Sequence, residues 1–277
     1  MRRALLLIAL ILPLAAFTSS ERLFAPSAEP WPRWERHDPS SRAVIDVAAW
    51  DGLLGRVVVA GADGINRVDY GALAGPEAAV LDRIVAGLSA VAVSRYNRDE
   101  QLAYWINLYN AVTLQVVARH YPVASIRDID ISPGWFVDGP WDAELVTVEG
   151  EALTLNDIEH RILRPLWQDP RIHYALNCAS LGCPDLAAAA WRGRDIDQRL
   201  DAAARAYVNH SRGVALRGGE VTVSKIYDWF LEDFGGSTES LLAHLRRHAA
   251  PPLAARLAQI GDIDGTAYDW GLNVTPP

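Results

Sequence analysis

The sequence predicts a single helix-rich α+β domain with a small, mostly antiparallel sheet. Three observations favour this fold class: helical spacing of apolar residues dominates the first half, two hairpin patterns follow it, and a short strand pattern closes the chain. Of the 277 residues, 50% are hydrophobic and 10 are tryptophan. A chain of this size and composition can bury a full core without covalent cross-links.

Residues 1–20 have the features of a signal peptide. Two arginines precede an uncharged run, residues 4–17, that is too short to cross a bilayer comfortably. An uncleaved N-terminal anchor is the alternative interpretation. We therefore expect a periplasmic or secreted protein. Its Pro-rich leader at 21–45 is either an extended linker or an arm laid on the domain, which spans 46–277.

The charge of the chain limits its partners. Residues 1–20 contain two arginines and no acids, so their removal changes the formal net charge from −8 to about −10. An acidic surface disfavours binding to nucleic acid. The sequence also lacks a basic amphipathic segment, so we expect no membrane binding after signal cleavage. A small molecule or a peptide is the expected ligand, and the sequence indicates no cofactor and no metal. The oligomeric state is left open.

The clearest expected element is a helix in "NRDEQLAYWINLYNAVTLQVVARHYP", preceded by helical patterns over residues 46–54 and 76–93. Asn97 and Glu100 form the pattern of a capping box at its start, and Pro122 ends it. Apolar residues occupy both of its sides, so this helix is expected to be buried nearly all round.

Asn107 and Asn110 lie one turn apart on the second side of this helix. An unpaired buried amide costs about 1–3 kcal/mol, so both side chains are expected to have partners. The two amides either hold neighbouring backbone or line a polar pocket, and the sequence leaves both alternatives open.

Short elements alternate in the second half of the chain. A tryptophan-rich loop and a hairpin lead into the helix "LNDIEHRILRPLW", where Asn156 and Glu159 form a second capping-box pattern and Pro165 kinks or ends the helix. "RIHYALNC" alternates as a strand, which places His173 and Cys178 on opposite faces. The hairpin "VALRGGEVTV", two amphipathic helices and a last strand follow.

Both cysteines lie in "RIHYALNCASLGCPDL", for which three interpretations compete. A Cys178–Cys183 disulfide would close a short loop and contribute roughly 2 kcal/mol. A metal half-site has less support, because the spacing of His173 and the two cysteines lacks a second cluster. The third interpretation is a nucleophile. Pro184 is a natural first residue of a helix "PDLAAAAW", which would put Cys183 at the helix N-terminus, where the pKa of a thiol falls.

A thiol enzyme also needs a base and a group that orients the base. His173 and His160 are the nearest histidines in sequence, and Glu159 or the buried asparagines can hold an imidazole in one tautomer. The motifs of serine hydrolases, P-loop proteins, zinc proteases and dinucleotide-binding folds are absent, so those common alternatives lack support.

Five segments of the chain carry a family resemblance. "QLAYWINLYNAVTL", "ALTLNDIEHRILR", "RIHYALNCASLGCPDL", "SKIYDWFLEDFG" and "YDWGLN" resemble, in order, the signature blocks of the family called domain of unknown function 547. The blocks extend over roughly residues 50–273. The resemblance implies an exported protein in bacteria. Some eukaryotic relatives carry a glutaredoxin-like domain, which points to thiol chemistry.

The order of a buried helix before a histidine-bearing segment is also similar to papain-like and transglutaminase-like thiol hydrolases. Those enzymes begin this helix with the nucleophilic cysteine, whereas here it offers Asn107 and Asn110, so their mechanism is not transferred. The family resemblance implies one cluster of site residues: Asn107, Tyr109, Asn110, Glu159, His160, His173, Cys178, Cys183, Ser224, Asp228 and Asp233.

Two functional hypotheses follow. The first is a thiol-dependent hydrolase or transferase acting on a small peptide or a glutathione-like thiol, with Cys178 or Cys183 as nucleophile and His173 or His160 as base. Glu159 belongs to its catalytic set, and the substrate is held by the remaining residues of the cluster: Asn107, Tyr109, Asn110, Ser224, Asp228 and Asp233. The second is a non-catalytic ligand- or peptide-binding module with a structural Cys178–Cys183 disulfide.

Overall fold

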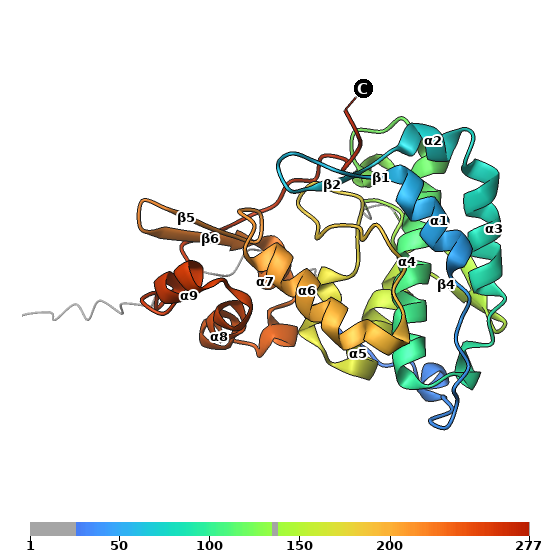
Figure 1. The fold of residues 1–277 in the computed structure, drawn as a ribbon, viewed down its shortest axis with the longest axis horizontal. Coiled ribbons are helices and arrows are strands. Elements are labelled where there is room, and N and C mark those ends of the chain that lie inside the picture. The colour runs from blue at the N-terminus through green and yellow to red at the C-terminus, as the bar shows by residue number, and fades with distance from the viewer. Residues whose placement is uncertain (1–25, 135–137, 277) are drawn as a thin grey trace, which may run out of the picture.

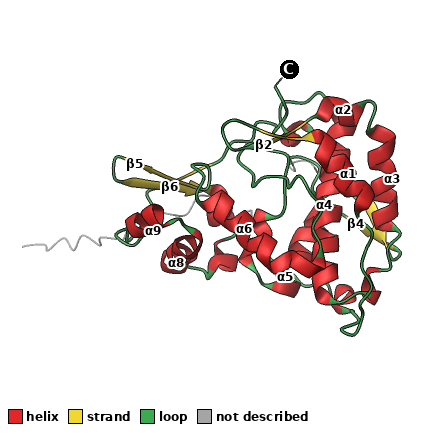
Figure 2. Ribbon diagram, viewed as in Figure 1, coloured by secondary structure: helices red, strands yellow, loops and turns green. Residues whose placement is uncertain are grey.

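A long buried helix forms the centre of the fold (Figures 1 and 2). The computed structural model describes residues 26–134 and 138–276, so the predicted signal peptide at 1–20 lies outside the described residues. Helix α4 spans Arg98–His120, and every residue from 100 to 118 is buried, as its sequence predicts. Around it pack three helices of the first half: α1 (Ala48–Val57), α2 (Tyr70–Ala74) and α3 (Ala78–Ser89).

The second half of the chain is made of short elements. Their bounds, in chain order, are β3 (Val146–Val148), β4 (Glu151–Leu153), the π-helical segment η5 (Asp157–Leu163), α5 (Arg164–Trp167), the 3-10 turn η6 (Pro170–Tyr174) and α6 (Ile196–Val208). The C-terminal part adds β5 (Val214–Arg217), β6 (Glu220–Ser224), α7 (Lys225–Trp229), the 3-10 turn η8 (Leu231–Phe234), α8 (Thr238–His248), α9 (Pro251–Leu257) and β7 (Gly265–Ala267). Figure 1 shows β5, β6, α8 and α9 at the end of the molecule opposite to α1, α2 and α3.

The strands form small separate sheets. Antiparallel pairs join β1 (Val58–Ala60) to β2 (Asn66–Val68), β3 to β4, and β5 to β6. Strand β7 adds to β6 in parallel, with Thr266 opposite Val223. The prediction of a helix-rich α+β domain with mostly antiparallel pairing is therefore confirmed, although the strands do not join into one sheet in the described part of the chain.

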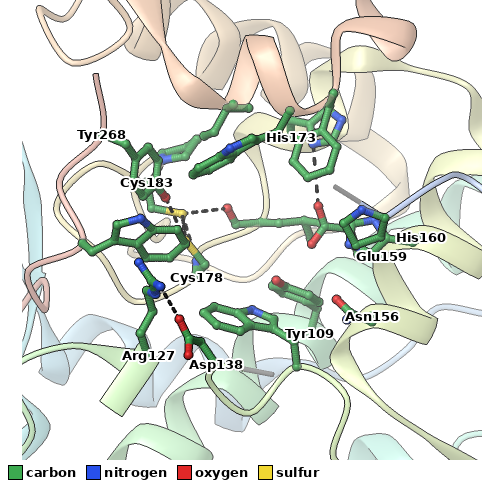
Figure 3. A pocket seen from close by; sticks show the side chains of 18 of the residues that line it. Tyr109, Arg127, Asp138, Asn156, Glu159, His160, His173, Cys178, Cys183 and Tyr268 are labelled. Atoms are coloured by element: carbon green, nitrogen blue, oxygen red, sulfur yellow. Dashed lines mark hydrogen bonds and ion pairs between the residues drawn. The ribbon is translucent and has the colours of Figure 1, made fainter. Parts of the chain in front are cut away.

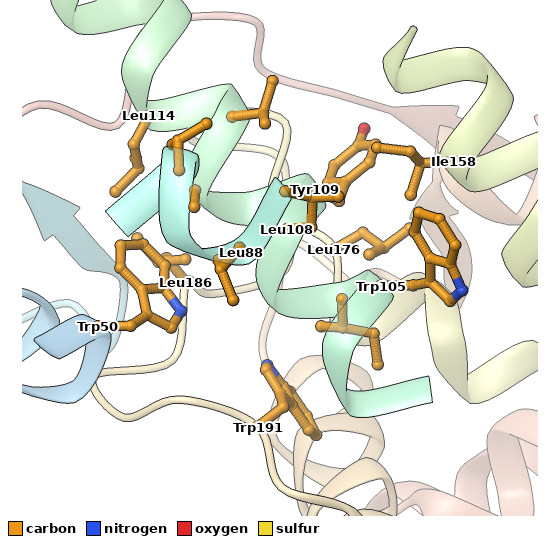
Figure 4. Close-up of a cluster of buried hydrophobic side chains, with 14 of the residues drawn as sticks. Trp50, Leu88, Trp105, Leu108, Tyr109, Leu114, Ile158, Leu176, Leu186 and Trp191 are labelled. Carbon is orange, nitrogen blue, oxygen red and sulfur yellow. The ribbon is translucent and has the colours of Figure 1, made fainter. Parts of the chain in front are cut away.

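Two clusters of buried side chains make the core. The larger one surrounds α4 and includes Trp50 and Trp105, which are 2% and 1% exposed (Figure 4). The smaller one gathers Tyr174, Tyr207 and Tyr227 with the apolar faces of α6, α8 and the β5–β6 hairpin. Burying one large apolar side chain contributes about 1.5–3 kcal/mol, so these clusters are the main source of stability.

The predicted start of α4 is confirmed in part. The Asn97 side chain accepts a hydrogen bond from the Glu100 amide at 3.0 Å, which caps the helix. The reciprocal half of the capping box is absent from the described contacts, because the Glu100 carboxylate instead accepts from the amide of Ile45 at 3.3 Å. The helix ends at His120, two residues before Pro122, as predicted.

The predicted capping box at Asn156 and Glu159 is wrong. Asn156 donates instead to Asp142 at 2.6 Å, and Glu159 turns toward a pocket. Thr154 and Asp157 take over the capping: the Thr154 amide donates to the Asp157 carboxylate at 3.0 Å, and the Asp157 amide donates to the Thr154 hydroxyl at 2.9 Å. Glu159 is thereby left available for a role in the pocket.

The predicted strand in "RIHYALNC" is also wrong. Asp169 accepts from the Arg171 amide at 2.9 Å and caps the 3-10 turn η6, which ends at Tyr174. Both Ile172 and His173 are buried, at 0% and 4% exposure, so the alternation of residue types does not separate a buried face from an exposed one. His173 and Cys178 are therefore not held on opposite faces of a strand.

The helix predicted for "PDLAAAAW" does not form either. Asp185 pairs with Arg212 at 2.7 Å and accepts from the Asn66 amide at 2.8 Å, while the Asn66 side chain donates to the Leu186 carbonyl at 2.9 Å. These tertiary bonds hold the segment as a loop despite the high helix propensity of its alanines. Cys183 consequently does not sit at a helix N-terminus.

The described part of the Pro-rich leader lies against the domain as an arm. The amide of Glu29 donates to the His160 carbonyl and that of Trp31 to the Arg161 carbonyl, each at 3.0 Å. Trp34 is 2% exposed and packs edge-on against Trp105 at 5.0 Å between ring centroids. The arm therefore covers η5 and adds to the core around α4.

Candidate functional site

A pocket of about 450 Å³ collects residues from distant parts of the chain (Figure 3). A volume of this size suits a small molecule or a short peptide. The lining comes from α4, the loop before β3, η5, η6, α7, the C-terminal segment and the loop that carries Cys178 and Cys183, here called the cysteine loop. Its residues are Pro26, Tyr109, Arg127, Asp138, Trp141, Asp142, Asn156, Glu159, His160, His173, Leu176, Cys178, Cys183, Pro184, Ile226, Trp229, Phe230, Tyr268 and Trp270.

Six of the residues that the sequence singled out line this pocket: Tyr109, Glu159, His160, His173, Cys178 and Cys183. All five candidate catalytic residues are among them. The structure therefore brings together side chains that span 75 positions of sequence, from Tyr109 to Cys183. The other five predicted residues, Asn107, Asn110, Ser224, Asp228 and Asp233, lie outside the lining.

The two thiols are in contact but are not bonded to each other in this structure. Their Sγ atoms lie 2.8 Å apart, and both cysteines are free. Cys178 is half-buried and Cys183 is 3% exposed, so Cys178 is the thiol that a ligand in the pocket can reach more easily. The Sγ atom of Cys178 also lies 3.0 Å from the Tyr268 hydroxyl and 3.4 Å from the Ser180 hydroxyl.

These contacts make Cys178 the more acidic thiol. The hydrogen bond between the two thiols is the main cause that lowers the pKa of Cys178. Burial opposes it, and the Ser180 and Tyr268 hydroxyls lower the pKa further. Burial raises the pKa of Cys183 well above its ordinary value, and the neighbouring Cys178 raises it again. Ionisation is therefore favoured at Cys178, whose thiolate is stabilised by the neighbouring Cys183 thiol and by the Ser180 and Tyr268 hydroxyls.

The loop between the cysteines is held in an unusual conformation. Ala179 has a φ of 59°, a left-handed conformation that a non-glycine residue rarely adopts. The buried Asn177 side chain stabilises it, accepting from the Ala179 amide at 3.0 Å and donating to the Pro184 carbonyl at 2.7 Å. The amide of Gly182 donates to the Asp269 carbonyl at 2.8 Å, which ties the loop to the C-terminal segment.

His173 lies between two carboxylates. Its Nε2 atom is 2.7 Å from Asp233, its Nδ1 atom is 3.7 Å from Glu159, and its ring stacks on Phe230 at 4.5 Å. Burial by itself raises the pKa of Asp233, but hydrogen bonds from His173 and from Arg164 outweigh burial and hold that pKa well below the ordinary value. Asp233 is thus an anion that positions His173 from behind the pocket wall.

His160 is a neutral residue of the same wall. Burial lowers its pKa to about 4, and the Arg164 guanidinium donates to its Nδ1 atom at 3.0 Å. Among the described residues, neither His160 nor His173 makes a hydrogen bond to a cysteine sulfur. The expected direct pairing of a thiol with an imidazole base is therefore absent from this arrangement.

Asn107 and Asn110 hold neighbouring backbone. The Asn107 amide accepts from the Trp50 indole at 3.2 Å and from the Trp191 amide at 2.9 Å, and it donates to the Trp191 carbonyl at 2.8 Å. Asn110 donates to the Ala175 carbonyl and accepts from the Asn177 amide, each at 2.9 Å. Of the two alternatives left open for these amides, the structure shows the one in which they tie segments together.

Ser224 and Asp228 are buried in and beside α7. The Ser224 hydroxyl accepts from the Ile226 amide at 3.3 Å, as expected for a helix cap, and from the Tyr207 hydroxyl at 2.9 Å. Asp228 is 1% exposed within the same helix. Neither residue lines the pocket.

The sequence placed tryptophans in a ligand pocket for the binding-module hypothesis, but it did not indicate which aromatic residues form the pocket wall. Trp229, Tyr268 and Trp270 pack against one another at 4.7–5.6 Å between centroids, and Trp141 reaches Trp270 at 5.9 Å. The abundance of tryptophan and the "YDWGLN" block were visible signals, but neither indicates that these rings face the cysteines. Arg127 pairs with Asp138 at the rim of the pocket (Figure 3).

The described residues contain no group of three or more His, Cys, Asp or Glu side chains arranged to hold a metal ion. In the same residues, no helix combines the length and the apolar character needed to cross a membrane.

Comparison with known proteins gave one family. The model of the family described as "Protein of unknown function, DUF547" matches residues 93–208, a segment that contains α4, η5, η6 and both cysteines. The searches of curated proteins and of solved structures found no match.

Proposed function

Residues 93–208 place this chain in the DUF547 family, whose description assigns no activity, and from that premise we propose a function on the chemistry of the pocket. The proposal is an exported, thiol-dependent hydrolase or transferase that acts on a small peptide or a glutathione-like thiol. Cys178 is its nucleophile. The observation that carries the proposal is the contact set of Cys178, a half-buried residue that lines the pocket and whose sulfur contacts three hydrogen-bonding groups.

A thiol with a lowered pKa does not require a histidine in direct contact to become a nucleophile. The Cys178 thiolate attacks the carbonyl carbon of an amide or thioester, forming an S–C bond while the C–N or C–S bond to the leaving group breaks. The leaving group takes up a proton. Water or a second thiol then takes the acyl group, loses a proton and releases the Cys178 thiolate.

Proton transfer in this scheme is assigned to the Glu159 and His173 pair. Both side chains line the pocket, and they lie 3.7 Å apart. Asp233 fixes the far nitrogen of His173 at 2.7 Å, so the imidazole is oriented with its other nitrogen toward Glu159. The Tyr268 hydroxyl, 3.0 Å from the Cys178 sulfur, is placed to hydrogen-bond the charge that develops on the attacked group.

The test is turnover of a panel of aminoacyl and dipeptidyl thioesters and anilides by the full chain. Cys178→Ser is expected to lower kcat/KM by at least about a thousandfold, because a serine hydroxyl is far less ionised than this thiol. Cys183→Ser keeps a hydrogen-bond donor beside Cys178 and is expected to retain measurable turnover. Equal turnover by the wild type and Cys178→Ser, with both folded, would rule out the thiol mechanism.

A second candidate function is a non-catalytic periplasmic module that binds a ligand or peptide and carries a Cys178–Cys183 disulfide. It is favoured by the 2.8 Å separation of the two sulfurs, since a bond between them needs little movement. Alkylation of the mature protein with and without reduction, followed by intact-mass analysis, separates the two functions. Two free thiols support the enzyme, whereas none before reduction supports the binding module.

A further inference from the structure

The pocket has an aromatic wall whose rings are not part of the sealed core. Trp141, Trp229, Tyr268 and Trp270 are all half-buried, in contrast to core rings such as Trp105, which is 1% exposed. Their centroids form a chain of contacts at 4.7–5.9 Å. The faces of such rings attract cations, and they also bury the apolar part of a ligand.

The charged groups of the pocket are mostly acids. Asp142 accepts a hydrogen bond from the neutral Asn156 amide at 2.6 Å, and among the described residues it forms no ion pair with an arginine. Glu159 is 9% exposed, and its carboxylate lies 3.7 Å from the Nδ1 atom of His173. Two carboxylates therefore line the pocket without a permanently charged partner.

Arg127, the one arginine among the described residues of the lining, does not neutralise these acids. Arg127 is paired with Asp138, and its guanidinium lies 5.4 Å from the Trp270 ring. That pair is exposed at the rim and its two charges cancel, so the interior keeps the negative charge of Asp142 and Glu159. The position of Arg127 over the Trp270 ring shows that this aromatic wall already packs against one cation.

From these observations we infer that the site selects a substrate carrying a primary ammonium group, such as the amino terminus of a peptide or the amine of an aminoacyl thioester. The ammonium binds between Asp142, Asn156 and the aromatic wall, and the attached carbonyl faces Cys178. This inference rests on the proposed function and names its substrate class. The net negative charge of the chain adds a weak, long-range attraction for the same kind of ligand.

The hydrogen-bonding capacity of the pocket fits this ligand. Asn156 uses its amide nitrogen on Asp142, so its carbonyl oxygen remains an acceptor, as do the second oxygen of Asp142 and the Glu159 carboxylate. An ammonium group has three donors and no acceptor. A carboxylate in the same place would meet two like charges and would lack donors, so it is disfavoured.

The experiment measures binding without turnover, so that it is independent of the thiol mechanism. Full-length Cys178→Ser is titrated by tryptophan fluorescence with L-leucinamide, N-acetyl-L-leucinamide and N-acetyl-L-leucine. L-Leucinamide is expected to bind saturably, and acetylation of its amine is expected to weaken binding by at least about tenfold because the charge and two donors are lost. N-acetyl-L-leucine, which presents a carboxylate, is expected not to saturate the site.

Matched variants locate the effect. Asp142→Asn keeps the size of the side chain and is expected to weaken L-leucinamide binding by about tenfold, through loss of the charge alone. Asp82→Asn removes the same charge from an exposed position on α3 that is paired with Arg119, and its binding is expected to match the parent. Equal binding of the free and acetylated amides, no saturation by L-leucinamide, or no effect of Asp142→Asn would each overturn the inference.

The two proposals fail in distinguishable ways. Saturable, amine-dependent binding together with turnover that is insensitive to Cys178→Ser would remove the thiol mechanism and leave the ammonium site in place. Turnover that depends on Cys178 but shows no preference for free amines would retain the enzyme and remove the assigned substrate class.

Discussion

The Nε2 atom of His173 lies 2.7 Å from the carboxylate of Asp233, a residue 60 positions further along the chain. The same carboxylate accepts hydrogen bonds from the buried Arg164 guanidinium at 2.6 and 3.1 Å. Asp233 therefore joins η8 to η6 and α5, and it fixes the orientation of an imidazole that lines the pocket.

Asp233→Asn keeps the shape of this side chain and removes its charge. The substitution leaves the Arg164 cation buried without its ionic partner, so we expect the free energy of unfolding to fall by about 3 kcal/mol. Because His173 also loses its anchor, kcat is expected to fall more than KM rises. Urea titration and steady-state kinetics measure the two effects. Asp233→Asn with unchanged stability and kcat would contradict the positioning role.

The stability of the protein is expected to fall as the pH drops below neutrality. Burial lowers the pKa of His160 and of His244 to about 4 from an unfolded value near 6.5, so folding favours their neutral forms. This contribution is fully present above the unfolded pKa and is lost as the pH falls through the folded pKa. Urea unfolding between pH 7.5 and 4 checks it, and a constant free energy over that range would refute it.

Asp233 adds a second loss of stability at lower pH. Its folded pKa is held below the unfolded value near 3.9, so its stabilising charge is present above that value and disappears as the pH falls toward the folded pKa. In Asp233→Asn, the free energy of unfolding is therefore expected to fall less below about pH 4 than in the wild type. The decrease at higher pH, which comes from the histidines, is expected to be unchanged.

Mild oxidation is expected to join the two thiols. Diamide accepts two hydrogens as Cys178 and Cys183, whose sulfurs are 2.8 Å apart, form a disulfide. The protein would then lose both titratable thiols and its turnover, and dithiothreitol would restore both. Intact mass and thiol titration follow the reaction. In Cys183→Ser no internal disulfide can form, so a reversible inactivation identical to that of the wild type would contradict the prediction.

Gly182 allows the cysteine loop to approach the C-terminal segment. A Cβ atom at this position would lie 2.7 Å from the Asp269 amide nitrogen and 3.0 Å from its carbonyl oxygen. Gly182→Ala is therefore expected to displace Tyr268 from Cys178, to lower turnover, and to destabilise the protein by about 1–3 kcal/mol. Thermal unfolding and kinetics measure these effects.

Gly55→Ala is the matched control for that change. Gly55 lies inside α1, and a Cβ atom there would meet nothing within 4 Å. Alanine is expected to stabilise the helix by about 0.5–1 kcal/mol and to leave turnover unchanged. If Gly182→Ala behaves like this control, close packing of the loop against Asp269 is not what positions Tyr268.

Asn107→Ala separates a structural amide from a substrate-binding one. The change leaves the Trp50 indole and the backbone of Trp191 without their buried partner, so we expect a loss of about 3 kcal/mol of stability. Turnover per folded molecule is expected to persist, because Asn107 is not in the pocket lining. A stable Asn107→Ala variant with lost turnover would instead assign the amide to substrate binding.

Much of the helical first half and part of the site were predictable from the sequence. The Asn97 cap, the stop before Pro122 and the continuous burial of α4 follow from hydrogen bonds and periodicity within a few residues. Glu159, His160, His173 and the two cysteines stood out because they are reactive or ionisable groups in apolar surroundings, and all of them line one pocket.

The errors have a shared physical cause. "RIHYALNC" and "PDLAAAAW" have local patterns of a strand and a helix, but distant partners control their backbones: Asn110 accepts from the Asn177 amide, and Asn66 bonds to the Leu186 carbonyl. These bonds are made to residues 67 and 120 positions away. Local propensity is weak compared with such tertiary contacts, so it predicted regular elements where the chain forms loops.

The sequence by itself determined the fold class, the central helix and the identity of the reactive side chains, because these depend on composition and on interactions between near neighbours. Only the tertiary structure decided that Tyr268 lies 3.0 Å from Cys178, that His173 is anchored by Asp233 instead of meeting a thiol, and which tryptophans line the pocket. The first two of those relationships join residues 90 and 60 positions apart, and packing of the whole core sets them.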